Sequence, residues 1–105
     1  PLKMPMTPED MRDNADKAAA LLKAMANPHR LLLLCLLNDG EMSVSELNQQ
    51  VTIPQSSLSQ HLAALRRENL VLTRRDAQTI FYTLASAEVK AIITTLYDLY
   101  CVPHD

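Results

Sequence analysis

One stretch of the sequence decides the fold: Ser43-Val-Ser-Glu-Leu-Asn-Gln-Gln-Val-Thr-Ile-Pro-Gln-Ser-Ser-Leu-Ser-Gln-His-Leu-Ala-Ala-Leu-Arg-Arg67. Ser43 and Glu46 have the spacing of a capping box, in which each side chain accepts a hydrogen bond from the other residue's backbone N–H. A short helix is therefore predicted to begin here and to end at a turn formed by Thr52-Ile53-Pro54. A second helix is predicted over residues 55–68. Two helices joined by a tight turn are typical of a helix-turn-helix unit.

The segment from Leu70 to Leu84 is predicted to be a β-hairpin. Residues 71–75 and 79–84 are rich in β-branched and aromatic side chains, and Asp76-Ala77-Gln78 supplies a loop between them, although no glycine marks it. A helix-turn-helix at 43–68 followed at once by a basic hairpin at 70–84 predicts a winged helix-turn-helix, which is a DNA-reading unit.

Two helices are expected before this unit and one after it. Thr7 caps the first, Asn27-Pro28 ends it and begins the second, and Ser86 caps the last. The second helix is apolar on nearly every side, so we expect it to be buried centrally and to close at Gly40 in a left-handed cap. The first and last helices carry apolar stripes at spacings of three and four: Met11, Ala15, Ala18, Leu22 and Met25, then Val89, Ile92, Ile93, Leu96 and Leu99.

The fold class expected is therefore mainly α with a small β-hairpin wing, in the order α-α-α-α-β-β-α. The chain has 105 residues and one glycine, which predicts a single domain over residues 1–105. Its longest apolar run, Leu31 to Leu37, is too short to cross a membrane. Residues 1–16 mix acids, bases and prolines, unlike a signal peptide. We expect a cytoplasmic protein with no membrane partner.

The net charge of -2 does not suggest a nucleic-acid partner, but the charge is unevenly distributed. Within residues 61–80, four arginines stand against Glu68 and Asp76, for a net charge of +2: Arg66, Arg67, Arg74 and Arg75. Such a cluster is the local footprint of a DNA-binding protein. A solvated, charged helix end is the alternative interpretation.

A helical wheel of residues 55–68 separates two faces. Leu58, Leu62 and Leu65 share one side, which predicts that this side packs on the core. The opposite side has almost no acids, and its side chains suit base edges and phosphates, since glutamine pairs with adenine and arginine with guanine or phosphate. The candidate DNA contacts on this helix are Gln55, Ser56, Ser57, Ser59, Gln60, Arg66 and Arg67.

Three further candidates are expected at the hairpin tip, where they would reach phosphates or the minor groove: Arg74, Arg75 and Gln78. The alternatives are an ordinary solvent-exposed helix face and a loop whose charges serve solubility. His61 falls toward the buried flank of the second helix, which favours a structural histidine over a ligand or a base reader.

From about Asp16 to Cys101 the chain resembles the ArsR/SmtB family of dimeric winged-helix transcription regulators. Residues 22–30, 57–62 and 79–84 carry the resemblance. It implies a homodimer built on the first and last helices. The two recognition helices would then lie about 34 Å apart and read a palindromic operator in double-stranded DNA.

The metal sites of that family do not match this sequence. Where its arsenic-type members have Cys-Val-Cys, this chain has Ser43-Val44-Ser45, and hydroxyls do not replace thiolates as ligands of soft metals. The other site needs histidine on the last helix, and residues 86–100 contain none. We therefore expect no metal and no cofactor.

The cysteines make the chain most similar to the thiol-sensing HlyU/BigR/SqrR branch. That resemblance implies that Cys35 and Cys101 meet within a subunit and respond to oxidants or reactive sulfur. On the residues alone, the leucines around Cys35 favour an inert thiol with a raised pKa. The resemblance implies a regulator switched by thiol chemistry, which either represses directly or activates by competing with a nucleoid silencing protein.

An enzyme is not expected. Cys35 and His29 lie about 240° apart around one helix, and the sequence has no glycine-rich phosphate loop. Two other functions remain open: a DNA-binding regulator whose cysteines are only structural, and a winged-helix module that binds protein. Salt-dependent binding to a DNA duplex would distinguish the last from the others.

Overall fold

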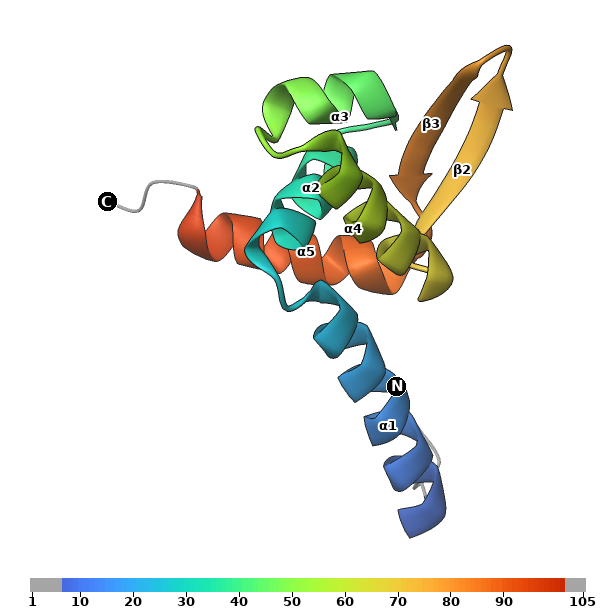
Figure 1. Cartoon of the computed structure of the whole chain (residues 1–105). Helices are drawn as coiled ribbons and strands as arrows, with labels where there is room; N and C mark the ends of the chain where they lie inside the picture. The colour runs from blue at the N-terminus through green and yellow to red at the C-terminus, as the bar shows by residue number, and fades with distance from the viewer. Residues whose placement is uncertain (1–6, 102–105) are drawn as a thin grey trace.

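The computed structural model describes residues 7–101. Residues 1–6, which belong to the segment 1–16 that is unlike a signal peptide, lie outside the described residues. Within this range the helices and strands follow in the order shown in Figure 1: α1 (Pro8–Met25), α2 (Pro28–Asn38), β1 (Met42–Ser43), α3 (Val44–Gln50), α4 (Gln55–Arg67), β2 (Val71–Asp76), β3 (Thr79–Leu84) and α5 (Ala87–Tyr100). The expected helical fold with a hairpin wing is confirmed. The strand β1 is an addition to it.

The helices begin at the caps that the sequence predicts. The Ser43 hydroxyl accepts a hydrogen bond from the Glu46 N–H at 3.1 Å, and the Glu46 carboxylate accepts one from the Ser43 N–H at 2.8 Å. Thr7 caps α1, Asn27 caps α2 and Ser86 caps α5 in the same manner. These bonds satisfy backbone donors that the first turn of a helix leaves free, which is why they set the boundaries.

The left-handed cap expected at Gly40 is wrong. Its φ of 144° lies far from the left-handed helical value of about 57°, and the α2 cap residue, Asp39, is right-handed. Asn69 takes the left-handed conformation instead, at φ 62°, directly after α4. There the Leu70 N–H donates to the Leu65 carbonyl at 2.9 Å, which makes a Schellman motif that leads from α4 into the wing.

The sheet has three antiparallel strands in the order β1-β3-β2. Met42 pairs with Tyr82, and Ser43 pairs with Phe81, so β1 attaches the base of the wing to the start of α3. Two residues carry no readable periodicity, which is why the sequence did not reveal this strand. The wing turn contains no glycine because Ala77 adopts a φ of 56°, at a cost of about 1 kcal/mol.

The core lies where α2, α3, α4, α5 and the base of the wing meet. Leu33 and Leu34 of α2 are fully buried at its centre. α2 is buried centrally, as expected, at Leu33, Leu34 and Leu37, whereas Leu32 on another side of the helix is 44% exposed in the single chain. Most of α1 projects away from this body (Figure 1), so only Ala24 and Met25 of that helix are buried.

No single helix in residues 7–101 is long and apolar enough to cross a membrane. The pair α1 and α2 passes by length and composition together, but the break between the two helices bends them by 96°.

Candidate nucleic-acid interface

The two faces of α4 lie as the sequence predicts. Leu58, Leu62 and Leu65 are buried against the body. Six of the seven candidate DNA contacts on this helix are exposed and the seventh, Ser57, is half-buried: Gln55, Ser56, Ser59, Gln60, Arg66 and Arg67. The leucines thus anchor α4 while its polar side chains remain available to a partner.

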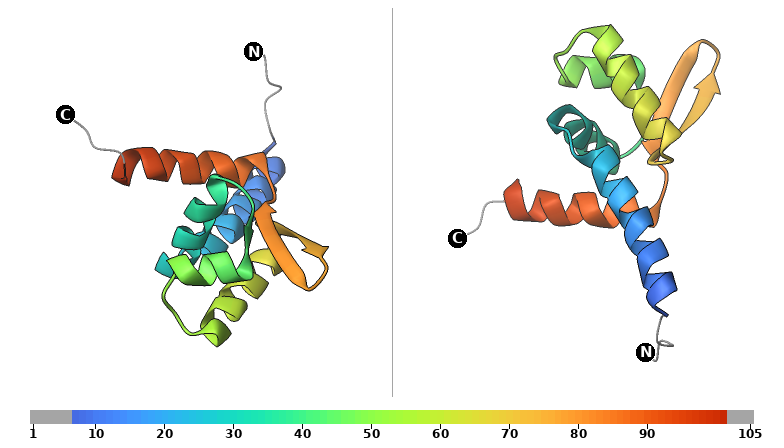
Figure 2. Two further views of the ribbon diagram at one scale, coloured as in Figure 1. Left: turned by 90° about the horizontal axis from the view of Figure 1, so that it is seen from above. Right: turned by 60° about the horizontal axis from the view of Figure 1, so that its bottom comes forward.

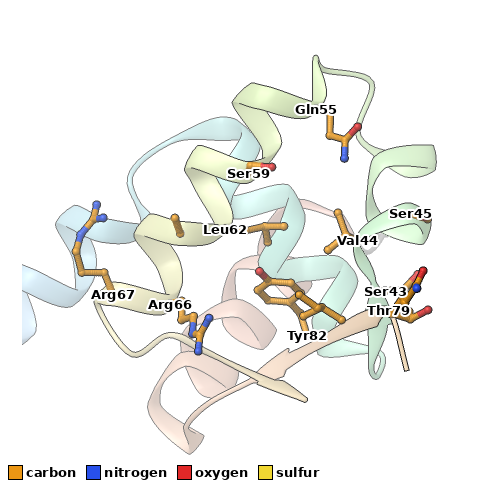
Figure 3. Close-up of a pocket in the computed structure, with 13 residues that line it drawn as sticks. Ser43, Val44, Ser45, Gln55, Ser59, Leu62, Arg66, Arg67, Thr79 and Tyr82 are labelled. Atoms are coloured by element: carbon orange, nitrogen blue, oxygen red, sulfur yellow. The ribbon is translucent and has the colours of Figure 1, made fainter. Parts of the chain in front are cut away.

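A groove of about 720 Å³ separates α4 from α3 and the wing (Figure 3). Both views in Figure 2 place α4 and the wing side by side. The groove brings together five of the ten candidate DNA contacts: Gln55, Ser59, Arg66, Arg67 and Gln78. The other five, Ser56, Ser57, Gln60, Arg74 and Arg75, do not line it. No lining residue is acidic, so a polyanion can approach the groove without meeting a carboxylate there.

Sequence reasoning missed four polar residues of this groove: Ser43, Ser45, Thr79 and Tyr82. The sequence shows Ser43 only as a helix cap, and Ser43 and Ser45 only as hydroxyls in place of metal-binding thiolates. Both residues lie at the start of α3 and line the same groove as α4. The packing of the two helices brings them there. The one available signal was the frequency of hydroxyl side chains on both sides of the predicted turn.

Arg74 does not lie at the hairpin tip as expected. It pairs with Phe81 along the strands, whereas the turn consists of Ala77 and Gln78. Its guanidinium donates two hydrogen bonds to the Glu41 carboxylate, at 2.7 and 2.6 Å, and lies 4.4 Å above the Phe81 ring. This pairing raises the pKa of Arg74 and lowers that of Glu41. Arg75 is adjacent to the turn, as expected, and pairs with Ile80.

His61 links α4 to α2, which agrees with the structural role expected for it. The Arg30 Nε donates to His61 Nδ1 at 3.2 Å, and the same guanidinium donates to the Ala24 carbonyl at 3.2 Å. An acceptor Nδ1 requires a neutral ring. Desolvation, followed by the positive charges of Arg30 and His29, lowers the pKa of His61.

Acidification is expected to destabilise the protein through His61. Because the folded-state pKa lies below the unfolded value of about 6.5, the unfolded chain binds the proton first as the pH falls. The stability from neutral His61 is fully present above pH ~6.5 and is lost as the pH falls through the folded pKa. Urea unfolding at pH values of about 7.5 and 5.5 measures the loss.

The matched variants for this experiment are His61→Gln and His29→Gln. Glutamine at position 61 keeps an acceptor for Arg30 but does not titrate, so the difference between the two pH values should shrink. His29→Gln should leave most of that difference in place. A wild-type-sized difference in the His61→Gln chain would contradict the assignment.

The two cysteines meet at one place in the fold. Cys35 on α2 is half-buried and Cys101 at the end of α5 is exposed, and both are free thiols. They line the same cavity of about 240 Å³, whose other walls are apolar or aromatic: Leu31, Leu96, Tyr97 and Tyr100. Burial, and then the charges of Cys101 and Asp39, raise the pKa of Cys35. Residues 7–101 hold no cluster of three or more His, Cys, Asp or Glu side chains suited to a metal.

A capped helix-turn-helix, an acid-free groove and a hairpin wing define a winged-helix protein of the kind that regulates transcription. The family model for the bacterial regulatory proteins of the arsR family matches residues 27–73. The transcriptional activator HlyU of Vibrio cholerae is 58% identical over 92% of this chain and 90% of its own length. The biofilm growth-associated repressor of Xylella fastidiosa is 46% identical over 91% of this chain and 84% of its own.

The solved structure of reduced HlyU from Vibrio cholerae superposes with a TM-score of 0.86 at 57% identity, covering 90% of this chain and 99% of that one. The chain therefore belongs to the ArsR family of bacterial transcription regulators. It is a DNA-binding regulator and not an enzyme. The resemblance drawn from the sequence is confirmed at the level of family and fold.

Proposed function

We propose that this regulator binds a palindromic operator as a homodimer in the cytoplasm and that thiol chemistry at Cys35 and Cys101 changes its affinity. The observation that carries DNA binding is the outer face of α4 together with the acid-free groove beside it. Ser56 and Gln60 point to base readout, because their side chains are exposed and can both donate and accept hydrogen bonds.

The groove residues suit the phosphate backbone. In a winged-helix complex with α4 in the major groove, a strand of the duplex passes between that helix and the wing. Arg66 and Arg67 would contact its phosphates from one side and Gln78 from the other, with Arg75 extending the contact along the wing. The start of α4 has no side-chain cap, so its first N–H groups are free to donate to phosphates at the other end of the helix.

The homodimer is supported by apolar side chains that the single chain leaves in solvent. Met11 and Leu22 on α1 and Leu99 and Tyr100 on α5 are each more than half exposed, and Tyr100 reaches 82%. Large apolar side chains that a single chain leaves exposed on two helices are typical of an interface. A second copy would cover it and would hold two α4 helices at a fixed separation, as a palindrome requires. Sedimentation equilibrium should give twice the chain mass.

Two substitutions test the interface with DNA. Gln60→Ala should relax the choice of sequence, with a loss of discrimination of about 5- to 150-fold at one base pair, since a bidentate contact contributes about 1–3 kcal/mol. Arg75→Ala should weaken binding about equally on all duplexes, whatever their sequence, and should reduce the salt dependence of binding. Fluorescence anisotropy with a selected duplex and single-base variants of it measures both effects.

Arg12→Ala is the matched control for the wing arginine, because it removes the same charge from an exposed position on α1. It should leave the affinity and the salt dependence close to the wild-type values. If Gln60→Ala and Arg75→Ala behave like Arg12→Ala, α4 and the wing do not read DNA as proposed.

The thiol switch is supported by the shared cavity of Cys35 and Cys101. With peroxide as oxidant, the exposed Cys101 thiolate attacks an oxygen atom, which gives a sulfenic acid and releases hydroxide. The Cys35 thiolate then attacks that sulfur, forms the S–S bond and displaces a second hydroxide. The two thiol protons convert both hydroxides to water, and the peroxide has gained two electrons. Cys35 reacts second because it is half-buried while Cys101 is exposed, and the same burial raises the pKa of Cys35.

The direction of regulation follows from the position of the operator. The relatives include an activator and a repressor, and both are similar to this chain over most of its length. Occupancy of a promoter represses transcription, whereas occupancy of a site held by a nucleoid silencing protein activates it by competition. We propose that the same DNA-binding surface serves both outcomes.

A further inference from the structure

We infer that Arg74 is a positioning residue, which holds the wing at a fixed angle to the helix-turn-helix through Glu41 and does not itself contact DNA. The inference rests on the proposed DNA binding by α4 and the wing. The geometry that supports it is unusual for an exposed arginine. The side chain starts on β2, crosses the Phe81 ring on β3 and ends at Glu41, next to β1. One residue therefore spans all three strands of the sheet.

The contacts of Arg74 are well formed. Nε and one terminal nitrogen bind the two carboxylate oxygens of Glu41, at 2.7 and 2.6 Å, in the bidentate arrangement that limits rotation of both groups. The guanidinium carbon lies 4.4 Å from the centre of the Phe81 ring, within the range of a cation–π contact. Phe81 is also the residue directly opposite Arg74 in the β2–β3 pairing. The aromatic ring thus supports the arginine along its path to Glu41.

Beyond the buried base of the wing, the pairing that joins the sheet to the start of α3 is short. β1 pairs with β3 at only two positions, Met42 with Tyr82 and Ser43 with Phe81. Ser43 also caps α3, so the base of the wing is joined to the helix-turn-helix by a two-residue ladder. The Arg74–Glu41 pair adds a second link between β2 and the chain that enters β1. Together with the β1 ladder and the buried Val71 at the base of the wing, this link resists a change of wing angle.

The same contacts make Arg74 a poor phosphate ligand. Two of its nitrogens are already committed to Glu41, and the carboxylate would repel a phosphate brought beside it. Arg75 differs, because in the part of the chain that the structure describes its guanidinium has no hydrogen bond or ion pair. Adjacent residues of a strand point to opposite faces, so Arg74 and Arg75 divide two tasks: one orients the wing and the other meets DNA.

The experiment measures binding to one duplex, selected from random-sequence DNA, over a range of salt concentrations. The slope of log affinity against log salt is negative, and Arg75→Gln should make it shallower by about 0.9 per subunit, as expected for one lost phosphate contact. Arg74→Gln and Glu41→Gln should each weaken binding about two- to fivefold and leave the slope at its wild-type value. Glu41→Gln would instead tighten binding and steepen the slope if Arg74 were an available phosphate ligand, and that result would overturn the inference.

A charge swap gives the sharper comparison. Arg74→Glu should bind weakly, and adding Glu41→Arg should recover most of the affinity, because the ion pair re-forms with its ends exchanged. Glu41→Arg alone is the control, because the arginine introduced there could itself attract phosphate: it should weaken binding if the ion pair positions the wing, and tighten it if this site contacts phosphate. A double variant as weak as Arg74→Glu would contradict the positioning role.

Amide hydrogen exchange of the DNA-free protein tests the support without the operator. Arg74→Gln and Glu41→Gln should both speed exchange in the β1–β3 ladder, whereas Arg75→Gln should not. Unchanged exchange in all three would refute the support even if DNA binding behaves as proposed. Failure of the wild-type protein to bind any duplex would refute the proposed function. Faster exchange in the Arg74→Gln and Glu41→Gln variants would still support the positioning role of Arg74.

Discussion

Replacing Leu58 by alanine is expected to lower the free energy of unfolding by about 2–5 kcal/mol. Leu58 is 0% exposed and lies on the side of α4 that packs on the body, so the substitution leaves a cavity that a close-packed core closes only in part. A small domain has only about 5–15 kcal/mol of stability in total. Urea denaturation at a fixed chain concentration, in the presence of reductant, measures the change.

Leu72→Ala is the matched control, because it is the same substitution at a leucine that is 58% exposed on β2. Its effect should stay within about 0.5 kcal/mol. Equal urea midpoints for the Leu58→Ala and wild-type chains would mean that the leucines of α4 do not hold it to the body. The outward orientation of its serines, glutamine and arginines would then lose its structural basis.

Oxidation of the wild-type protein is expected to change its affinity for the operator by about tenfold or more, as is common when two states are coupled to binding. A bond between Cys35 and Cys101 would join α2 to the end of α5 and close a loop of about 66 residues. In the chain-entropy model, closing a loop of this length stabilises the folded subunit relative to the unfolded chain by about 4 kcal/mol. The joined state would alter the packing between the core and the helix proposed to form the dimer. Anisotropy titrations before and after peroxide treatment measure the change.

Cys35→Ser is the control for this effect. The variant should bind the operator like the reduced wild-type protein and should not respond to peroxide. The mass of the oxidised wild-type chain should fall by two hydrogen atoms without doubling, because the bridge forms within a subunit. A Cys35→Ser protein that responds like the wild type, or an oxidised wild-type protein with unchanged affinity, would contradict a switch formed by a Cys35–Cys101 bond.

The elements predicted from the sequence agree with the structure where the signal is local. Asn27 accepts hydrogen bonds from residues two and three positions further along, and Ser43 and Glu46 bond to each other across one helical turn. The apolar period of α4 is local in the same sense, since it depends on spacings of three and four. The conformation of Gly40 does not follow from the sequence, because glycine adopts many positive φ values and the amino acid alone does not select the left-handed helical one.

The starts of the helices, the buried side of α4 and the family are readable from the sequence, because each depends on residues within a few positions of one another or on the order of motifs. Three long-range relations are visible only in the folded chain: Arg74 binds Glu41, 33 positions away, β1 joins the wing, and Cys35 and Cys101 share a cavity. These contacts form between elements that pack together after they have folded locally. Which residues meet in these contacts depends on how helices and strands pack against one core, and the spacing of residues along the chain does not predict it.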